Sequence, residues 1–237
     1  MRQTPAQRHL QHKLAQIASA SAAPGGEVHG SAYEMMLLQL ANHRRNLKGI
    51  QSIERKIDAK RSFLPDYDAW IDGALASGAG GNDVVLTTVL IWQIDVGNYP
   101  RALQIAAYAI EHSLPLPDQY ERTLPVALID EFATAAITGK MPHSLALVLL
   151  PRVLELTEGH DAPDQARAKL HKALGYALIG KTGSADVDHD KVPEAPARAA
   201  LAHLQRALDL WDQVGVKKDI ERLERHVKQF PAPDPAI

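Results

Sequence analysis

The chain has 237 residues, of which 46% are hydrophobic, so it can bury a sizeable core as one large domain or two small ones. It contains no cysteine, which excludes disulfide bonds and thiolate chemistry and fits a reducing cytoplasm. No apolar run approaches the ~20 residues that span a bilayer, and the first residues lack the apolar stretch of a signal peptide.

Charge is unevenly distributed along the chain. The net charge is −2, but residues 1–61 carry a balance of +6 and residues 62–237 a balance of −8. A basic N-terminal quarter on an acidic body indicates a polyanion contact at one end and a protein contact at the other.

Hydrophobic periodicity and helix start and stop signals predict an all-α chain without strands. The expected helices are Pro5–Ser19, Ser31–Arg61, Asp66–Leu75, Asp83–Val96, Pro100–His112, Val126–Thr138, Ser144–Leu156, Asp164–Ile179, Ala197–Val214 and Val216–Phe230. The expected connections are Ala20–Gly30, Ala76–Gly81, Pro115–Pro125 and Gly180–Pro196. By role we expect a basic helical DNA-binding and assembly region (1–62), a helical-hairpin body for oligomer and partner contacts (63–230) and a disordered tail (231–237).

Three local features qualify these helices. Thr4 followed by Pro5 predicts the start of the first helix, on which Leu10, Leu14 and Ile17 form an apolar stripe. Asn82 is expected to cap the very apolar helix Asp83–Val96, which should be central to the core. Pro151 is expected to kink its helix.

The stretch Ser31–Arg61 is expected to form one long basic helix that begins with a capping box of Ser31 and Glu34. A rough heptad of apolar residues runs through it: Met36, Leu40, Leu47, Ile50 and Ile57. These residues can pack on another subunit or on the first helix. The second half carries seven cations within 18 residues. Two interpretations stay open, a helix lying along a phosphate backbone and a solvated face with local ion pairs.

Two stretches have the spacing of helical hairpins. Gly97-Asn98-Tyr99 precedes Ala102, Ala106 and Ala109, a spacing of four and three that is typical of the second helix of a tetratricopeptide-type repeat. The same spacing recurs at Ala200, Leu204 and Ala207, so Asp164–Val214 is expected to form a second hairpin with a longer central loop.

Candidate catalytic and metal-binding groups are few. Asp186, Asp188 and Asp190 match the first three ligand positions of a calcium loop, but Lys191 stands where that loop needs glycine. The pair His9 and His12 has no third ligand nearby in the sequence.

Asp66, Asp68 and Asp72 cluster at one helix start. They can hold magnesium for phosphodiester cleavage or simply compensate the helix dipole. No phosphate-cradling G-x-x-x-x-G-K-[ST] loop is present. We therefore expect no catalytic residue, no metal and no cofactor.

Several stretches, spread over about residues 3–228, together resemble a known family. They are Thr4–His9, Tyr33-Glu34 with Met36-Leu37, Leu64-Pro65 with Trp70, Gly97-Asn98, Arg167–Lys172, Ala202–Ala207, and Gly215–Lys218 with Ile220–Arg225. The chain is similar in these stretches to the small terminase subunit of temperate contractile-tailed, cohesive-end phages, also named the terminase endonuclease subunit.

The resemblance implies a role in packaging viral DNA in the bacterial host cytoplasm. Its implied partners are double-stranded viral DNA at the cohesive-end site, the terminase large (ATPase) subunit and further copies of itself. Such relatives continue into a basic C-terminal tail, whereas this sequence ends in a Pro-rich stretch, so we expect the basic helix to substitute for that tail.

Our hypothesis from the sequence is a non-catalytic DNA-recognition and adaptor subunit. The residues expected to contact phosphates are Arg8, Lys13, Arg44, Arg45, Lys48, Arg55, Lys56, Lys60 and Arg61. Two alternatives remain, an intrinsic metal-dependent endonuclease that uses the Asp66–Asp72 cluster and a tetratricopeptide-like interaction scaffold that does not bind DNA.

Overall fold

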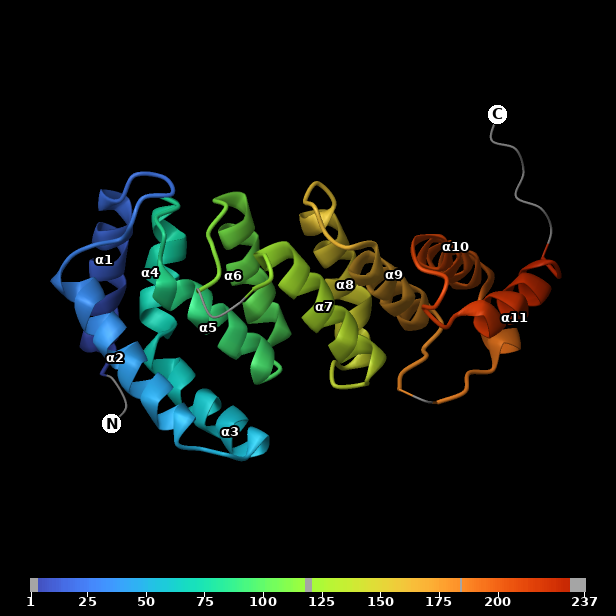
Figure 1. The fold of residues 1–237 in the computed structure, drawn as a ribbon, viewed down its shortest axis with the longest axis horizontal. Coiled ribbons are helices and arrows are strands. Elements are labelled where there is room, and N and C mark those ends of the chain that lie inside the picture. The colour runs from blue at the N-terminus through green and yellow to red at the C-terminus, as the bar shows by residue number, and fades with distance from the viewer. Residues whose placement is uncertain (1–3, 118–120, 184, 231–237) are drawn as a thin grey trace. The chain divides into compact units, whose positions relative to one another are not determined.

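The computed structural model describes residues 4–117, 121–183 and 185–230 (Figure 1). Within these ranges it contains helices and no strand beyond one isolated bridge between Glu27 and Asn82, which confirms the all-α prediction. The α-helices are α1 (Pro5–Ser21), α2 (Ser31–Lys48), α3 (Ile53–Phe63), α4 (Asp68–Ser77), α5 (Val84–Asp95), α6 (Tyr99–Glu111), α7 (Leu124–Ile137), α8 (His143–Thr157), α9 (Asp164–Leu178), α10 (Glu194–Leu210) and α11 (Lys217–Val227). The expected tail, residues 231–237, lies outside the described residues.

Packing divides the chain into two compact units, residues 1–124 and 125–237. The first unit holds α1 to α6, so the basic helices pack with the helices that follow them. The second unit holds α7, apart from its first residue, and α8 to α11. The division of roles at residue 62 stays a prediction about function. Among the described residues, no helix is both long and apolar enough to cross a bilayer.

Helix α5 is the centre of the first unit, as its composition predicts. Nearly all of its residues are buried, and Asp83 rather than Asn82 caps it. Asp83 Oδ1 accepts hydrogen bonds from the amides of Val85 (2.8 Å) and Leu86 (3.0 Å), and its Oδ2 accepts one from Trp70 Nε1 (2.8 Å). The prediction of Asn82 as the cap was wrong, because the carboxylate one residue later satisfies two open amides and an indole.

The interface between α1 and α4 depends on a missing side chain. A Cβ on Gly73 would overlap the carbonyl oxygen of His12 and lie 2.7 Å from Ala15 Cβ. The two helices therefore approach more closely than any larger residue would permit. Thr4 caps α1 in a reciprocal capping box with Gln7, which confirms the predicted helix start.

The prediction of one long helix over Ser31–Arg61 was wrong. Helix α2 ends at Lys48 with Gly49 as its C-cap, and α3 begins after Ser52, whose Oγ accepts a hydrogen bond from the Arg55 amide (3.3 Å). Glycine weakens the helix at this point, and serine offers a new N-cap three residues later. The capping box at Ser31 is also absent, because Gly30 is the N-cap residue of α2 and makes no side-chain bond.

The apolar heptad of this stretch faces the unit's own interior. Met36, Leu40 and Leu47 are buried, and Ile50 and Ile57 are half-buried. The three buried side chains are therefore not available to a second subunit.

Two helix pairs match the predicted hairpins. Ala102, Ala106 and Ala109 of α6 are fully buried in the first unit, where α6 packs on α5. In the second unit α9 packs on α10, and a Cβ on Gly175 would lie 2.6 Å from Leu204 Cδ2. Helix α10 begins at Glu194, earlier than predicted, and a 3-10 turn (His189–Lys191) precedes it. The tetratricopeptide-like character of both pairs stays a prediction, and so does the kink at Pro151, which lies within α8.

Candidate nucleic-acid interface

The predicted cations of α2 and α3 are mostly turned to solvent. Arg45 and Lys48 are exposed at the end of α2, and Arg55 is exposed at the start of α3, while Arg44 and Lys56 are half-buried. The break at residues 49–52 therefore lies between two groups of cations. Within the described residues we find no carboxylate paired with Lys48, Arg55 or Lys56.

Other predicted cations already have partners. Lys60 Nζ lies 2.5 Å from the carboxylate of Asp95 on α5, and Arg61 lies 2.6 Å from Asp58. These two side chains are the least suited to bind phosphate, since a phosphate would compete with a carboxylate. Arg45 donates to Asn42 Oδ1 (3.1 Å), a neutral partner that leaves the positive charge uncompensated.

An aromatic stack joins α2 to α3. The His43 ring lies 3.8 Å from the Phe63 ring, nearly parallel to it, and His43 Nδ1 lies 2.8 Å from Tyr67 Oη. Burial lowers the pKa of His43, with Asp66 acting in the opposite direction. The stack therefore fixes the two basic helices without adding a charge of its own near neutral pH.

A second group of charged side chains surrounds a cavity of about 710 Å³ in the first unit, which we call the α1–α4–α6 pocket. Helix α1 contributes the side chains of Arg8, His9 and His12. Helix α4 contributes Asp68 and Asp72, and α6 contributes Arg101. Lys13 lies outside this pocket, exposed on α1, where it donates to Gln16.

The acidic side chains of the pocket differ in their surroundings. Arg101 bonds to Asp72 (2.5 Å) and to Gln104 (2.7 Å), and these two bonds orient its guanidinium. Burial raises the pKa of Asp68, an effect that Arg101 opposes and Asp72 reinforces. Asp72 thus has a cationic partner in Arg101, whereas Arg8 stays exposed.

The structure separates the three acids proposed as a nuclease centre. Asp68 and Asp72 border the pocket, but Asp66 does not, and its backbone carbonyl accepts a bond from Gln11 Nε2 (3.2 Å). In the part of the chain that the structure describes, no three His, Asp or Glu residues are placed to hold a metal ion.

The acidic loop of the second unit does not form a calcium cluster either. Asp186 pairs with Arg222 (2.8 Å), Asp188 with Lys191 (2.9 Å), and Asp190 lies 3.7 Å from His226 Nδ1. Each carboxylate therefore has its own cationic or imidazole neighbour.

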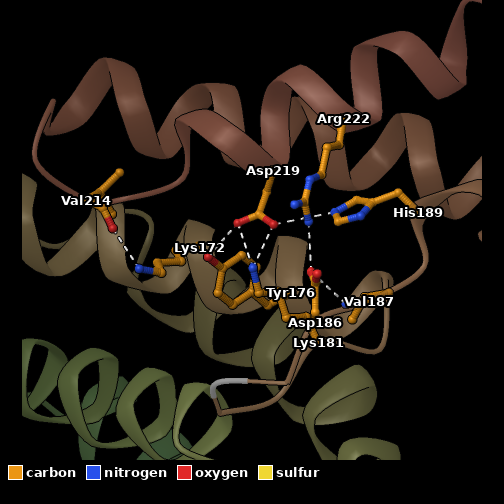
Figure 2. Close-up of polar contacts among 9 residues, drawn as sticks. All are labelled: Lys172, Tyr176, Lys181, Asp186, Val187, His189, Val214, Asp219 and Arg222. Atoms are coloured by element: carbon orange, nitrogen blue, oxygen red, sulfur yellow. Dashed lines mark hydrogen bonds and ion pairs between the residues drawn. The ribbon is translucent and has the colours of Figure 1, made fainter.

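Sequence reasoning missed a buried carboxylate, Asp219, that joins α11 to α9 and to the loop before α10 (Figure 2). Tyr176 Oη donates to its Oδ2 (2.9 Å), Lys181 Nζ lies 2.6 Å from its Oδ1, and His189 Nε2 lies 3.4 Å from Oδ1. Burial, the hydrogen bond and the charge of Asp219 all raise the pKa of Tyr176, so the hydroxyl keeps its proton and donates. The partners are 38 and 43 residues away in the sequence, where no local pattern connects them.

The stretch Arg167–Lys172, quoted above for its resemblance, supplies contacts between helices. Arg167 donates to carbonyl oxygens at the end of α8, and Lys169 pairs with Asp130 of α7 (2.9 Å). His171 Nδ1 lies 3.0 Å from His203 Nδ1 of α10, and Lys172 donates to the carbonyl of Val214 (2.7 Å). Helix α9 thus bonds to α7, to α10, to the end of α8 and to the turn that precedes α11.

Comparison with known proteins decides the family. Residues 37–165, more than half of the chain, match the family model described as phage small terminase subunit. The chain belongs to the phage small terminase subunit family. It is 42% identical over 234 residues to a protein of Escherichia phage P2 named "Terminase, endonuclease subunit", covering 98% of this chain and 89% of that protein.

A second relative is less similar to this chain. It is a protein of Haemophilus phage HP1 named "Probable terminase, endonuclease subunit", 26% identical over 200 residues, or 82% of this chain and 70% of that protein. No solved structure matches the chain. These matches confirm the family that the sequence stretches resemble.

Proposed function

We propose that this small terminase subunit recognises viral DNA through the cations of α2 and α3 and presents that DNA to the terminase large subunit in the host cytoplasm. The observation that carries the proposal is the exposed group Arg45, Lys48 and Arg55, three cations without a carboxylate partner among the described residues. Cations of this kind displace counterions from DNA and make binding strongly salt-dependent.

Self-assembly is part of the same proposal, and α1 offers a surface for it. Leu10, Leu14 and Ile17 form one stripe on α1, and their exposed fractions are 58%, 37% and 67%. An exposed apolar stripe of this kind on a soluble domain is typical of a protein contact. The stripe supports the homo-oligomer implied by the resemblance, and the hairpins and α11 of the second unit are proposed to contact the large subunit.

The test is DNA binding by the purified chain at a series of salt concentrations. Arg45→Ala/Lys48→Ala/Arg55→Ala should weaken binding to every duplex sequence and reduce the slope of log K against log salt by about three, since each phosphate contact contributes about 0.9. The matched control is Lys140→Ala/Lys217→Ala/Lys228→Ala, which removes three exposed cations of the second unit. An unchanged slope in the first variant would reject the α2–α3 face, and absence of any binding by the wild type would favour the scaffold alternative.

A second candidate function is DNA cleavage, because the P2 relative is named an endonuclease subunit and because Asp68 and Asp72 border one pocket with two histidines. The purified chain should be incubated with cohesive-end DNA and magnesium or manganese. Site-specific nicking that Asp68→Asn abolishes and Asp66→Asn preserves would establish this function, since Asp66 does not line the pocket. Absence of nicking by the wild type would leave recognition as the function.

A further inference from the structure

The turn between α2 and α3 projects from the lower edge of the first unit in the view of Figure 1. Helix α3, all of which the structure describes, has no buried residue, and its first residue, Ile53, is 77% exposed. This is the largest exposed fraction among the large hydrophobic side chains of residues 4–117, 121–183 and 185–230. Ile50 and Ile57 on either side of it are half-buried. An apolar side chain therefore stands in solvent at the tip of the projection, although the hydrophobic effect favours its burial.

The helix that carries this tip is anchored at its other end. The His43 ring of α2 stacks on the Phe63 ring at 3.8 Å, and Lys60 Nζ lies 2.5 Å from the carboxylate of Asp95. Both contacts hold the C-terminal half of α3, so its N-terminal end can meet a partner while the direction of the helix stays fixed. A side chain that enters a stack of bases needs such support, because it must separate two bases that attract each other.

The charge around Ile53 favours DNA over a protein surface as the partner. Between residues 45 and 56 the sequence carries four cations and one acid, Glu54, so a net charge of +3 remains. Lys48 precedes the turn and Arg55 follows it, so cations lie on both sides of the isoleucine in the chain. The centre of a protein–protein contact is depleted of charged residues, whereas proteins that unstack DNA combine arginine or lysine with an apolar wedge.

We propose that Ile53 inserts between two neighbouring base pairs of the duplex and bends the DNA at that step. The inference rests on the proposed function, in which the cations of α2 and α3 bind phosphates, and it adds a contact to the bases. Partial unstacking by an apolar wedge kinks a duplex by about 20–90°. Pyrimidine–purine steps unstack most readily, so the chain should prefer TA and CA steps to GG steps without any hydrogen bond to a base.

The experiment uses the full chain and a short duplex with a dye on each end and 2-aminopurine in place of adenine at a central TA step. Energy transfer between the dyes reports the bend, and the emission of 2-aminopurine reports unstacking. Binding of the wild type should shorten the distance between the duplex ends and raise the 2-aminopurine emission severalfold. A duplex with a central GG step should bind more weakly and bend less, because that step resists unstacking.

The variant Ile53→Ala should lose both signals and bind roughly tenfold more weakly, because three fewer carbon atoms contact the bases. Its slope of log K against log salt should stay unchanged, since no phosphate contact is removed. Ile53→Phe should restore the bend, because phenylalanine also serves as a wedge. Val148→Ala is the matched control, since Val148 of α8 is 63% exposed and lies in the second unit, and it should behave as the wild type.

Loss of the fold does not confuse this test, because Ile53 is exposed and alanine forms helix more readily than isoleucine. A bend and an emission rise that survive in Ile53→Ala would overturn the proposal. Weaker binding by Ile53→Ala, when the wild type itself does not unstack the duplex, would make Ile53 a groove contact and reject the wedge. A lower oligomer mass of Ile53→Ala without DNA, measured by native mass spectrometry, would assign the side chain to a contact between copies instead.

The same data separate the wedge from the proposed function. If Arg45→Ala/Lys48→Ala/Arg55→Ala reduces the salt slope while the wild type leaves the duplex straight, the wedge fails and the phosphate-binding face stands. If the wild type does not bind the duplex at low salt, both are rejected.

Discussion

The hydrogen bonds of Asp83 give the most direct test of the first unit. Asp83→Ala removes the N-cap of α5, which costs about 1 kcal/mol in free energy of unfolding. It also leaves the buried indole N–H of Trp70 without its acceptor, which costs a further 1–3 kcal/mol or so. Burial raises the pKa of Asp83, so alanine also relieves some desolvation of the charge, and we expect a net loss of about 2–3 kcal/mol.

Urea unfolding followed by far-ultraviolet circular dichroism measures this loss. With a slope of about 2 kcal/mol per molar urea, the unfolding midpoint should fall by about 1–1.5 M. Asn82→Ala is the control, because the Asn82 side chain bonds only to the exposed Glu27 and does not cap the helix.

A double-mutant cycle separates the two contributions. In a Trp70→Phe background there is no indole N–H left unbonded, so Asp83→Ala should cost only the cap. Equal costs in both backgrounds, or a cost below 0.5 kcal/mol or so in the wild type, would refute the account of Asp83 as both a cap and an indole acceptor.

Three further predictions concern packing, protonation and ion pairing. Gly73→Ala should destabilise the first unit by about 1–3 kcal/mol because α1 must move away from α4, whereas Gly49→Ala, at φ −74°, should change stability by less than about 1 kcal/mol in the same urea assay. Burial and His203 lower the pKa of His171 to about 4, so the folded state binds this proton less readily than the unfolded state. The melting temperature should therefore be highest above pH 6.5, the ordinary pKa of histidine, and should decline as the pH falls toward 4. The variant His171→Gln/His203→Gln should show a smaller decline. Lys181→Met should lower the free energy of unfolding by about 3 kcal/mol, because the buried carboxylate of Asp219 loses its cation. Lys191→Met removes an exposed ion pair and is the control. Equal urea midpoints for the two variants would contradict this prediction.

Helix content was predictable here because its signals are local. A few neighbouring residues are enough to predict each of these helices. Thr4 with Pro5 marks the start of α1. The run of apolar residues in α5 and the four-and-three spacing of alanines in α6 indicate which residues are buried. The long-helix prediction failed at Gly49–Ser52, where the apolar heptad continued across a break that glycine and a serine cap produce.

The polar sites were less predictable because their members are far apart in sequence. The cations of α2 and α3 could be found from their clustering, but not the pairing of Lys60 with Asp95. Arg101 of α6 borders the same cavity as His9 and His12 of α1 only in the folded first unit, where it pairs with Asp72 of α4. Such contacts depend on tertiary structure, which periodicity does not encode.

The buried carboxylate at the start of α11 has a consequence for how this family is dissected by truncation. A chain that stops at Val214 loses Asp219, so Tyr176 and Lys181 lose their shared acceptor, and Leu223 no longer covers α10. Helix α11 is thus an integral part of the second unit rather than a detachable appendage. Point substitutions on the exposed face of α11, such as Glu221→Lys, can map partner contacts without disturbing the packing of the second unit. The Glu221 side chain is exposed, and Arg225 bonds to its backbone carbonyl, which the substitution keeps.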